Sequence, residues 1–74
     1  MRKGNILVVK APPYYNKSYL YEIVSAGEKI VRANLYKSPT VRKSWGRDEL
    51  LLLFDMEIVR FATDQDISEL SAAD

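Results

Sequence analysis

The chain has no cysteine and no histidine among its 74 residues. Without cysteine there is no disulfide, and a cytoplasmic location is the default expectation. Without either residue type, a tetrahedral zinc site would need carboxylates alone, and the most common general base and soft nucleophile are both missing. The three glycines are isolated from one another, so no phosphate-binding loop is predicted. We therefore predict a protein that is not an enzyme and that holds neither a metal nor a cofactor.

Long hydrophobic runs are also lacking. The longest, residues 50–54, is far shorter than the roughly 20 residues that a membrane-spanning helix needs. The first apolar run, residues 6–9, is too short for the core of a signal peptide. We expect no membrane association. With 47% hydrophobic and 28% charged residues, the composition is that of a folded protein, and the length suits one small domain, expected to be a monomer.

The charge is divided between the two parts of the chain. Residues 1–47 carry ten basic and two acidic side chains, a net charge of +8, whereas residues 48–74 carry one basic and eight acidic side chains, a net charge of −7. The total of +1 conceals this division. Such a pattern indicates electrostatics directed at partners as well as at solubility.

The first half of the chain predicts strands. Residues 5–10 are apolar and β-branched and end at two prolines, and residues 12–18 form a loop. Residues 19–25 and 30–36 predict a hairpin in which Gly27 supplies the positive φ of the turn. On its second strand, alternation directs three residues toward the core and leaves the intervening face at least partly wet; the three are Val31, Ala33 and Leu35.

The second half is less regular. Ser38 and Pro39 are a suitable N-cap and first residue for a helix of at most two turns, ended by Gly46. Residues 50–54 fit either a strand or a short helical turn, and residues 56–62 fit a strand. Thr63 could cap a short helix, but the acidic end has little to bury and is expected to fray.

These elements predict an α+β fold that is mainly β. We expect a small antiparallel sheet of three or four strands built on the hairpin of residues 19–36, with one short helix. Residues 1–63 would form a single small globular domain, and residues 64–74 a flexible acidic tail.

The first candidate binding segment is the aromatic and basic loop that contains Tyr14, Tyr15 and Lys17. Tyrosine offers a large contact area with few rotamers to immobilise, and two prolines reduce the entropy lost on binding. The alternative is that some of these tyrosines, and Tyr19 in particular, simply close the edge of a small core.

The second candidate places three cations, Arg42, Lys43 and Arg47, around the only tryptophan, Trp45. An exposed tryptophan beside cations could stack on a base or fill a pocket of a partner. The alternative, which we favour, is that Trp45 anchors the core and the cations form a solvated rim. The acidic tail could mask these cations, engage a basic partner, or serve solubility alone.

Two segments, residues 1–10 and residues 19–25, together with the length, give the chain a resemblance to a family. It resembles the small transcription regulators that lytic bacteriophages encode against the RNA polymerase of their host, of the type found in a Xanthomonas phage. The resemblance implies a cytoplasmic protein of the host cell that binds the β and β′ subunits of polymerase. It further implies inhibition or redirection of transcription, for example by displacement of the σ factor, and antitermination.

Two other classes compete with this interpretation. A β-rich nucleic-acid-binding module of the SH3-like or Tudor-like kind would explain a basic half with interleaved aromatic residues. The equally acidic second half opposes phosphate, so we expect weak direct nucleic-acid binding or none. The third class is an assembly subunit whose exposed sheet edge pairs with another chain.

Overall fold

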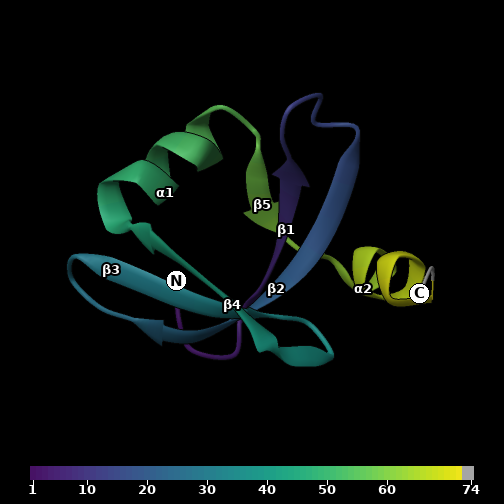
Figure 1. The fold of residues 1–74 in the computed structure, drawn as a ribbon, viewed down its shortest axis with the longest axis horizontal. Coiled ribbons are helices and arrows are strands. Elements are labelled where there is room, and N and C mark those ends of the chain that lie inside the picture. The colour runs from purple at the N-terminus through teal and green to yellow at the C-terminus, as the bar shows by residue number, and fades with distance from the viewer. Residues whose placement is uncertain (73–74) are drawn as a thin grey trace.

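The computed structural model describes residues 1–72 and consists of one five-stranded antiparallel sheet and two short helices (Figure 1). The mainly β prediction is therefore confirmed, with one strand and one helix more than expected. In chain order the elements are β1 (Ile6–Ala11), β2 (Lys17–Ala26), β3 (Ile30–Leu35), β4 (Ser38–Gly46), α1 (Arg47–Asp55), β5 (Val59–Phe61) and α2 (Asp64–Ala72).

The strand order across the sheet is β4-β3-β2-β1-β5. The first four strands form a meander, and α1 then carries the chain across so that β5 pairs with β1. In the register, Val9 of β1 lies between Tyr19 of β2 and Val59 of β5. The two ends of the chain thus share the same part of the sheet, and β4 and β5 are left as its edges.

The predicted hairpin of β2 and β3 is confirmed, but the reason for its glycine is different. Gly27 does not have a positive φ. Its N–H donates to the carbonyl oxygen of Ile30 at 2.9 Å, and a Cβ at this position would lie only 3.1 Å from that oxygen. Gly27 therefore permits a close backbone approach rather than a left-handed conformation.

The prediction of a helix that begins at Ser38 and Pro39 is wrong, because this segment forms β4. Residues 42–46 of β4 pair in regular register with β3, whereas the register shifts between Asn34 and Leu35 and leaves residues 39–41 as extra residues. Pro39 lies in this irregular part of an edge strand, where a missing N–H costs no ladder bond. Pairing with β3 thus overrides the local helix-start signal.

The helix occurs one segment later, as α1, which confirms the helical alternative for residues 50–54. Asp48 and Glu49 occupy its first turn, where the helix dipole favours negative charge. The strand predicted at residues 56–62 is also confirmed, but it is shorter and forms β5.

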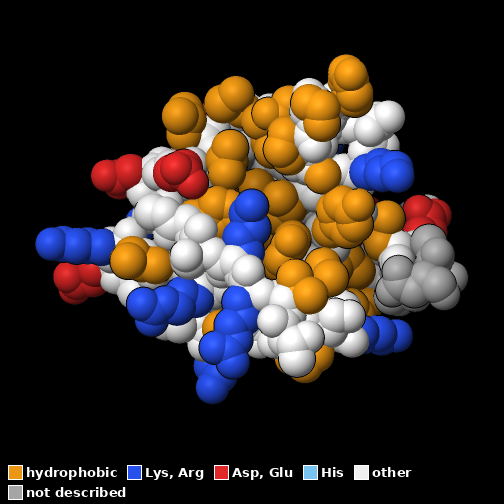
Figure 2. All heavy atoms as spheres, viewed as in Figure 1, with side chains coloured by type: hydrophobic (Ala, Val, Ile, Leu, Met, Phe, Trp, Pro, Cys, Tyr) orange, Lys and Arg blue, Asp and Glu red, His pale blue; other side chains and the backbone are white. Residues whose placement is uncertain are grey.

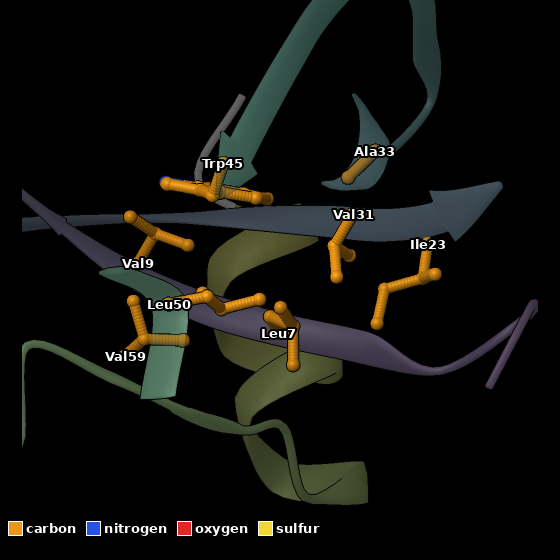
Figure 3. Close-up of a cluster of buried hydrophobic side chains, with 8 residues drawn as sticks. All are labelled: Leu7, Val9, Ile23, Val31, Ala33, Trp45, Leu50 and Val59. Atoms are coloured by element: carbon orange, nitrogen blue, oxygen red, sulfur yellow. The ribbon is translucent and has the colours of Figure 1, made fainter. Parts of the chain in front are cut away.

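The main core lies on the face of the sheet that α1 covers. Leu50 of α1 is fully buried there against side chains from all five strands (Figure 3). Trp45 is 4% exposed and meets Tyr21 edge-on, with 5.8 Å between ring centroids. The core interpretation of Trp45 is therefore confirmed, and of the residues predicted inward on β3, Val31 and Ala33 are buried and Leu35 is half-buried.

A smaller buried pair lies on the opposite face. Val8 and Leu20 face each other across β1 and β2, and both are buried although they belong outside the main cluster. Helix α2 contacts β2, and its Ile67 and Leu70 are half-buried, so we assign α2 to the covering of this pair.

The segment predicted to be a flexible tail therefore contains a helix, with residues 73 and 74 outside the described part of the chain. Thr63 caps this helix as expected: its hydroxyl accepts from the N–H of Asp66 at 3.2 Å, and Asp66 accepts from the N–H of Thr63 at 2.8 Å. Neither α2 nor any other described helix has the length and apolar character needed to cross a membrane.

Candidate partner-binding surfaces

The structure divides the six predicted contact residues among three regions. Lys17 lies at the start of β2. Arg42 lies at the level of Glu22 of the same strand, because both pair with Asn34 of β3. Lys17 and Glu22 are five residues apart, which is about 17 Å along the strand. The loop residues and the β4 cations thus lie in different parts of the sheet. The β1–β2 loop end holds Tyr14, Tyr15 and Lys17; β4 holds Arg42 and Lys43; and α1 begins with Arg47.

The β1–β2 loop holds its two tyrosines out of the core. Tyr14 is 82% exposed and Tyr15 is 45% exposed. The loop contains a cis peptide bond between Pro12 and Pro13, and Tyr15 has a φ of 56°, which is unusual for an aromatic residue. The N–H of Tyr15 donates to the carbonyl of Ala11 at 3.1 Å, which closes the turn. The alternative, that these tyrosines close the edge of the core, is therefore wrong for Tyr14.

Further exposed apolar side chains lie on the α1 side of the sheet; Tyr19 is near this loop, whereas Phe61 is at the level of Leu7, four residues or about 13 Å along β1 from Ala11. Tyr19 opposes Val9 and Phe61 opposes Leu7, so both point to the same face as the core, yet they are 44% and 50% exposed. Met56, directly after α1, is 57% exposed. Figure 2 shows hydrophobic side chains gathered over α1, β5 and the β1–β2 end of the sheet.

We define the apolar face as Tyr14, Tyr15, Tyr19, Met56 and Phe61. Sequence reasoning found the first two and considered Tyr19, but it gave Met56 and Phe61 no role. Alternation in residues 56–62 could have indicated Phe61 as inward-pointing, but its exposure depends on how little of the sheet α1 covers.

Arg47 has a structural role within the chain. Its Nη1 donates to the carbonyl oxygen of Gly27 at 2.7 Å, and its backbone N–H donates to the carbonyl of Lys29 at 2.8 Å. The start of α1 is thereby tied to the β2–β3 turn. Of the three predicted cations, Arg47 is the one with a hydrogen-bonded partner that explains its presence.

Arg42 lies instead beside a second arginine, Arg32. Val31 and Ala33 face the core, so Arg32 and Asn34 point to the other side of the sheet. Residues directly opposite each other share a face: Ser44 opposes Arg32, and Arg42 opposes Asn34. Sequence reasoning placed Arg32 on the wet face but missed its proximity to Arg42, because proximity across strands needs the register of β3 and β4.

These side chains surround an open depression of about 420 Å³ in the β3–β4 part of the sheet. We call it the β3–β4 depression. The residues that line it include no carboxylate and are Val24, Arg32, Ala33, Asn34, Arg42, Lys43 and Ser44. Arg32 and Arg42 point to this face of the sheet, whereas Lys43 opposes Ala33 and points to the core face. The Lys43 amino group also lies 5.7 Å from the centre of the Trp45 ring. Such a lining can accept an oxyanion through charge-assisted hydrogen bonds.

The acidic helix α2 contributes a carboxylate to an ion pair with Arg60 of β5. Asp66 forms a two-pronged pair with Arg60, with 2.8 Å between Oδ1 and Nη2 and a second contact between Oδ2 and Nη1. The hydrogen bond from Arg60, followed by that from the Thr63 backbone, holds the pKa of the Asp66 carboxyl well below its usual range. Within residues 1–72 this is the ion pair that α2 makes, and none joins it to Arg42 or Lys43. Masking of those cations by the tail stays a prediction.

Comparison with known proteins gives no relative: no protein-family model, curated protein or solved structure matches the chain. In the part of the chain that is described, no group of three or more carboxylates is placed to hold a metal ion. The apolar face and the β3–β4 depression are therefore the two candidate binding surfaces of the chain.

Proposed function

We propose that this protein is a non-enzymatic regulator that acts by binding another protein. The observation that carries the proposal is the apolar face. Three of its side chains, Tyr14, Met56 and Phe61, are half or more exposed in a chain of only 74 residues. Clustered exposed apolar side chains on a small protein are typical of interaction sites, and tyrosine is among the residues that contribute most to binding energy.

The proposed partner is the RNA polymerase of a bacterial host, through its β and β′ subunits. The resemblance to phage-encoded regulators supports this partner. Binding would take place in the host cytoplasm and would inhibit or redirect transcription, with displacement of the σ factor as one route.

In the proposed contact surface, the aromatic and the basic residues affect different rate constants of binding. Tyr14 and Tyr15 are the anchors, because rigid aromatic side chains that leave water on binding slow dissociation. Lys17 beside the loop, with Arg42 and Lys43 further away, would speed association with an acidic surface.

One observation favours the alternative of a nucleic-acid-binding module. The strand order, with a helix before the last strand, is also found in small SH3-like barrels, and the β3–β4 depression is cationic. Fold-level likeness does not determine function, however. The depression has no aromatic side chain on which a base could stack, and the acidic α2 covers another part of the sheet on the side of Arg32 and Arg42.

The test is an in vitro transcription assay with purified holoenzyme from Xanthomonas, a bacterium that hosts a phage of the resembled type. We expect the parent protein to reduce promoter-dependent initiation, and the Tyr14→Ala/Tyr15→Ala variant to do so only at higher concentration. Equal activity of parent and variant would reject the apolar face, and an inactive parent that binds no subunit would reject the partner.

A further inference from the structure

The outer edge of β4 is a strand edge without a neighbour. In the described part of the chain β4 is the last strand of the sheet, and residues 40–44 are all exposed. Residues 42–46 keep regular register with β3, so their other backbone groups are aligned for a further strand. Such an edge is a template for an added strand unless something blocks it.

The charges beside this edge decide what can pair with it. Arg32 and Arg42 point to the same face of the sheet in the β3–β4 depression, and no carboxylate lines it. A second copy pairing through β4 would bring two such groups to neighbouring strands, about 5 Å apart, and they would repel each other. The cations thus disfavour self-association through this edge and favour an acidic occupant.

We infer that the β4 edge binds an extended acidic segment of a partner protein as a sixth strand. Acidic side chains at alternate positions of that segment would lie on the face of Arg42 and Ser44. There, a carboxylate can accept the two N–H groups of Arg42, and Arg32 reaches in from the next strand. The intervening side chains would lie on the other face of β4, where alternation from Arg42 places Val41, 46% exposed, together with Lys43, and apolar residues at these positions would pack beside Val41.

A protein segment suits this site better than a nucleic acid does. A polynucleotide gains most of its affinity from several phosphates in a row and from stacked bases. The cationic lining is short, Glu22 lies on the same face beyond Asn34, and no aromatic ring lines the depression. An acidic peptide strand needs only one or two carboxylate contacts and backbone hydrogen bonds to β4, so it suits this short cationic lining.

The inference rests on the proposed function only in that both need a protein partner, and it concerns a different surface. The test uses no polymerase, so the two can fail separately. The probe is a fluorescein-labelled nine-residue peptide that alternates glutamate and valine, and binding is followed by anisotropy at two salt concentrations. Three comparison ligands are the glutamine version, the fully N-methylated glutamate version and a nine-nucleotide oligothymidine.

We expect the glutamate peptide to bind, more weakly at higher salt, and to shift the amide resonances of residues 42–46. The Arg42→Glu variant should lose at least tenfold in affinity. Lys10→Glu, the same charge change on β1, should lose less than twofold. Circular dichroism checks that both variants fold, and Arg42→Gln provides a second variant without a new acidic group.

Four results with the peptides would overturn the inference: no binding of the glutamate peptide, equal binding of the glutamine version, equal binding of the N-methylated version, or amide shifts outside β3 and β4. Tighter binding of the oligothymidine than of the glutamate peptide would also overturn it, in favour of a nucleic-acid site.

Discussion

At the scale of single residues, the turns of the sheet contain backbone conformations that the sequence does not predict. Lys37 in the β3–β4 turn has a φ of 64°, a conformation that costs a residue with a Cβ about 1 kcal/mol. The Lys37→Gly variant should therefore be about 0.5 kcal/mol more stable, since glycine's greater unfolded-state entropy offsets part of the gain. Urea unfolding measures this difference.

At Gly27, by contrast, the replacement of glycine by a residue with a Cβ should destabilise the protein. A Cβ there would meet the Ile30 carbonyl oxygen, which is fixed by the turn. Gly27→Ala should lower the free energy of unfolding by about 1–2 kcal/mol, in line with the cost of strain at a close backbone contact. An unchanged urea midpoint would mean that the turn relaxes freely, and that the close approach is not the reason for this glycine.

Trp45 is the largest side chain of the core. Its replacement by alanine leaves a cavity that typically costs 3–5 kcal/mol, comparable to the whole stability of a domain this small. We expect Trp45→Ala to be largely unfolded by circular dichroism and Trp45→Phe to fold with reduced stability. In the parent, the tryptophan emission should be blue-shifted and move to the red on unfolding; emission at the red wavelength in the native protein would contradict its burial.

At the scale of elements, α2 depends on Asp66. This carboxylate caps the helix with Thr63 and pairs with Arg60. Because folding lowers the pKa of Asp66, its contribution to stability is present above the ordinary carboxyl pKa of about 4 and is lost as the pH falls below it. Asp66→Asn should therefore be less stable than the parent at pH 7, and the difference should shrink toward pH 2. A difference that does not change with pH would argue against the charged pair.

The elements also show what the sequence can and cannot predict. The first strand and the β2–β3 hairpin follow from alternation and flanking prolines and glycine, which are local signals. The helix prediction for residues 38–46 is wrong because Ser38 and Pro39 are a good helix start, whereas the strand forms through pairing with β3. The exposed tyrosines could be identified from their loop, but Arg32 and Phe61 join the candidate surfaces only through the register of neighbouring strands.

At the scale of the whole molecule, the end of the acidic part, Asp64–Ala72, folds onto the sheet as α2. Deletion of this helix would uncover Val8 and Leu20, so neutralisation of the exposed Asp64 and Glu69 is the cleaner test of masking. We expect weak DNA binding by the parent and stronger binding by Asp64→Asn/Glu69→Gln, measured by anisotropy with a duplex at low salt. Unchanged affinity would reject masking of the cations by α2.

The measurement that tests the central proposal most directly is the binding of purified Xanthomonas RNA polymerase to the immobilised protein, followed by biolayer interferometry. We expect the parent to bind, and Tyr14→Ala/Tyr15→Ala to dissociate at least tenfold faster with an unchanged circular dichroism spectrum. As the matched control, Tyr36→Ala removes a half-buried tyrosine outside the apolar face and should leave the dissociation rate within twofold of the parent. If polymerase does not bind the parent, or leaves the double variant at the parent's rate, the proposed role of the apolar face in polymerase binding is wrong.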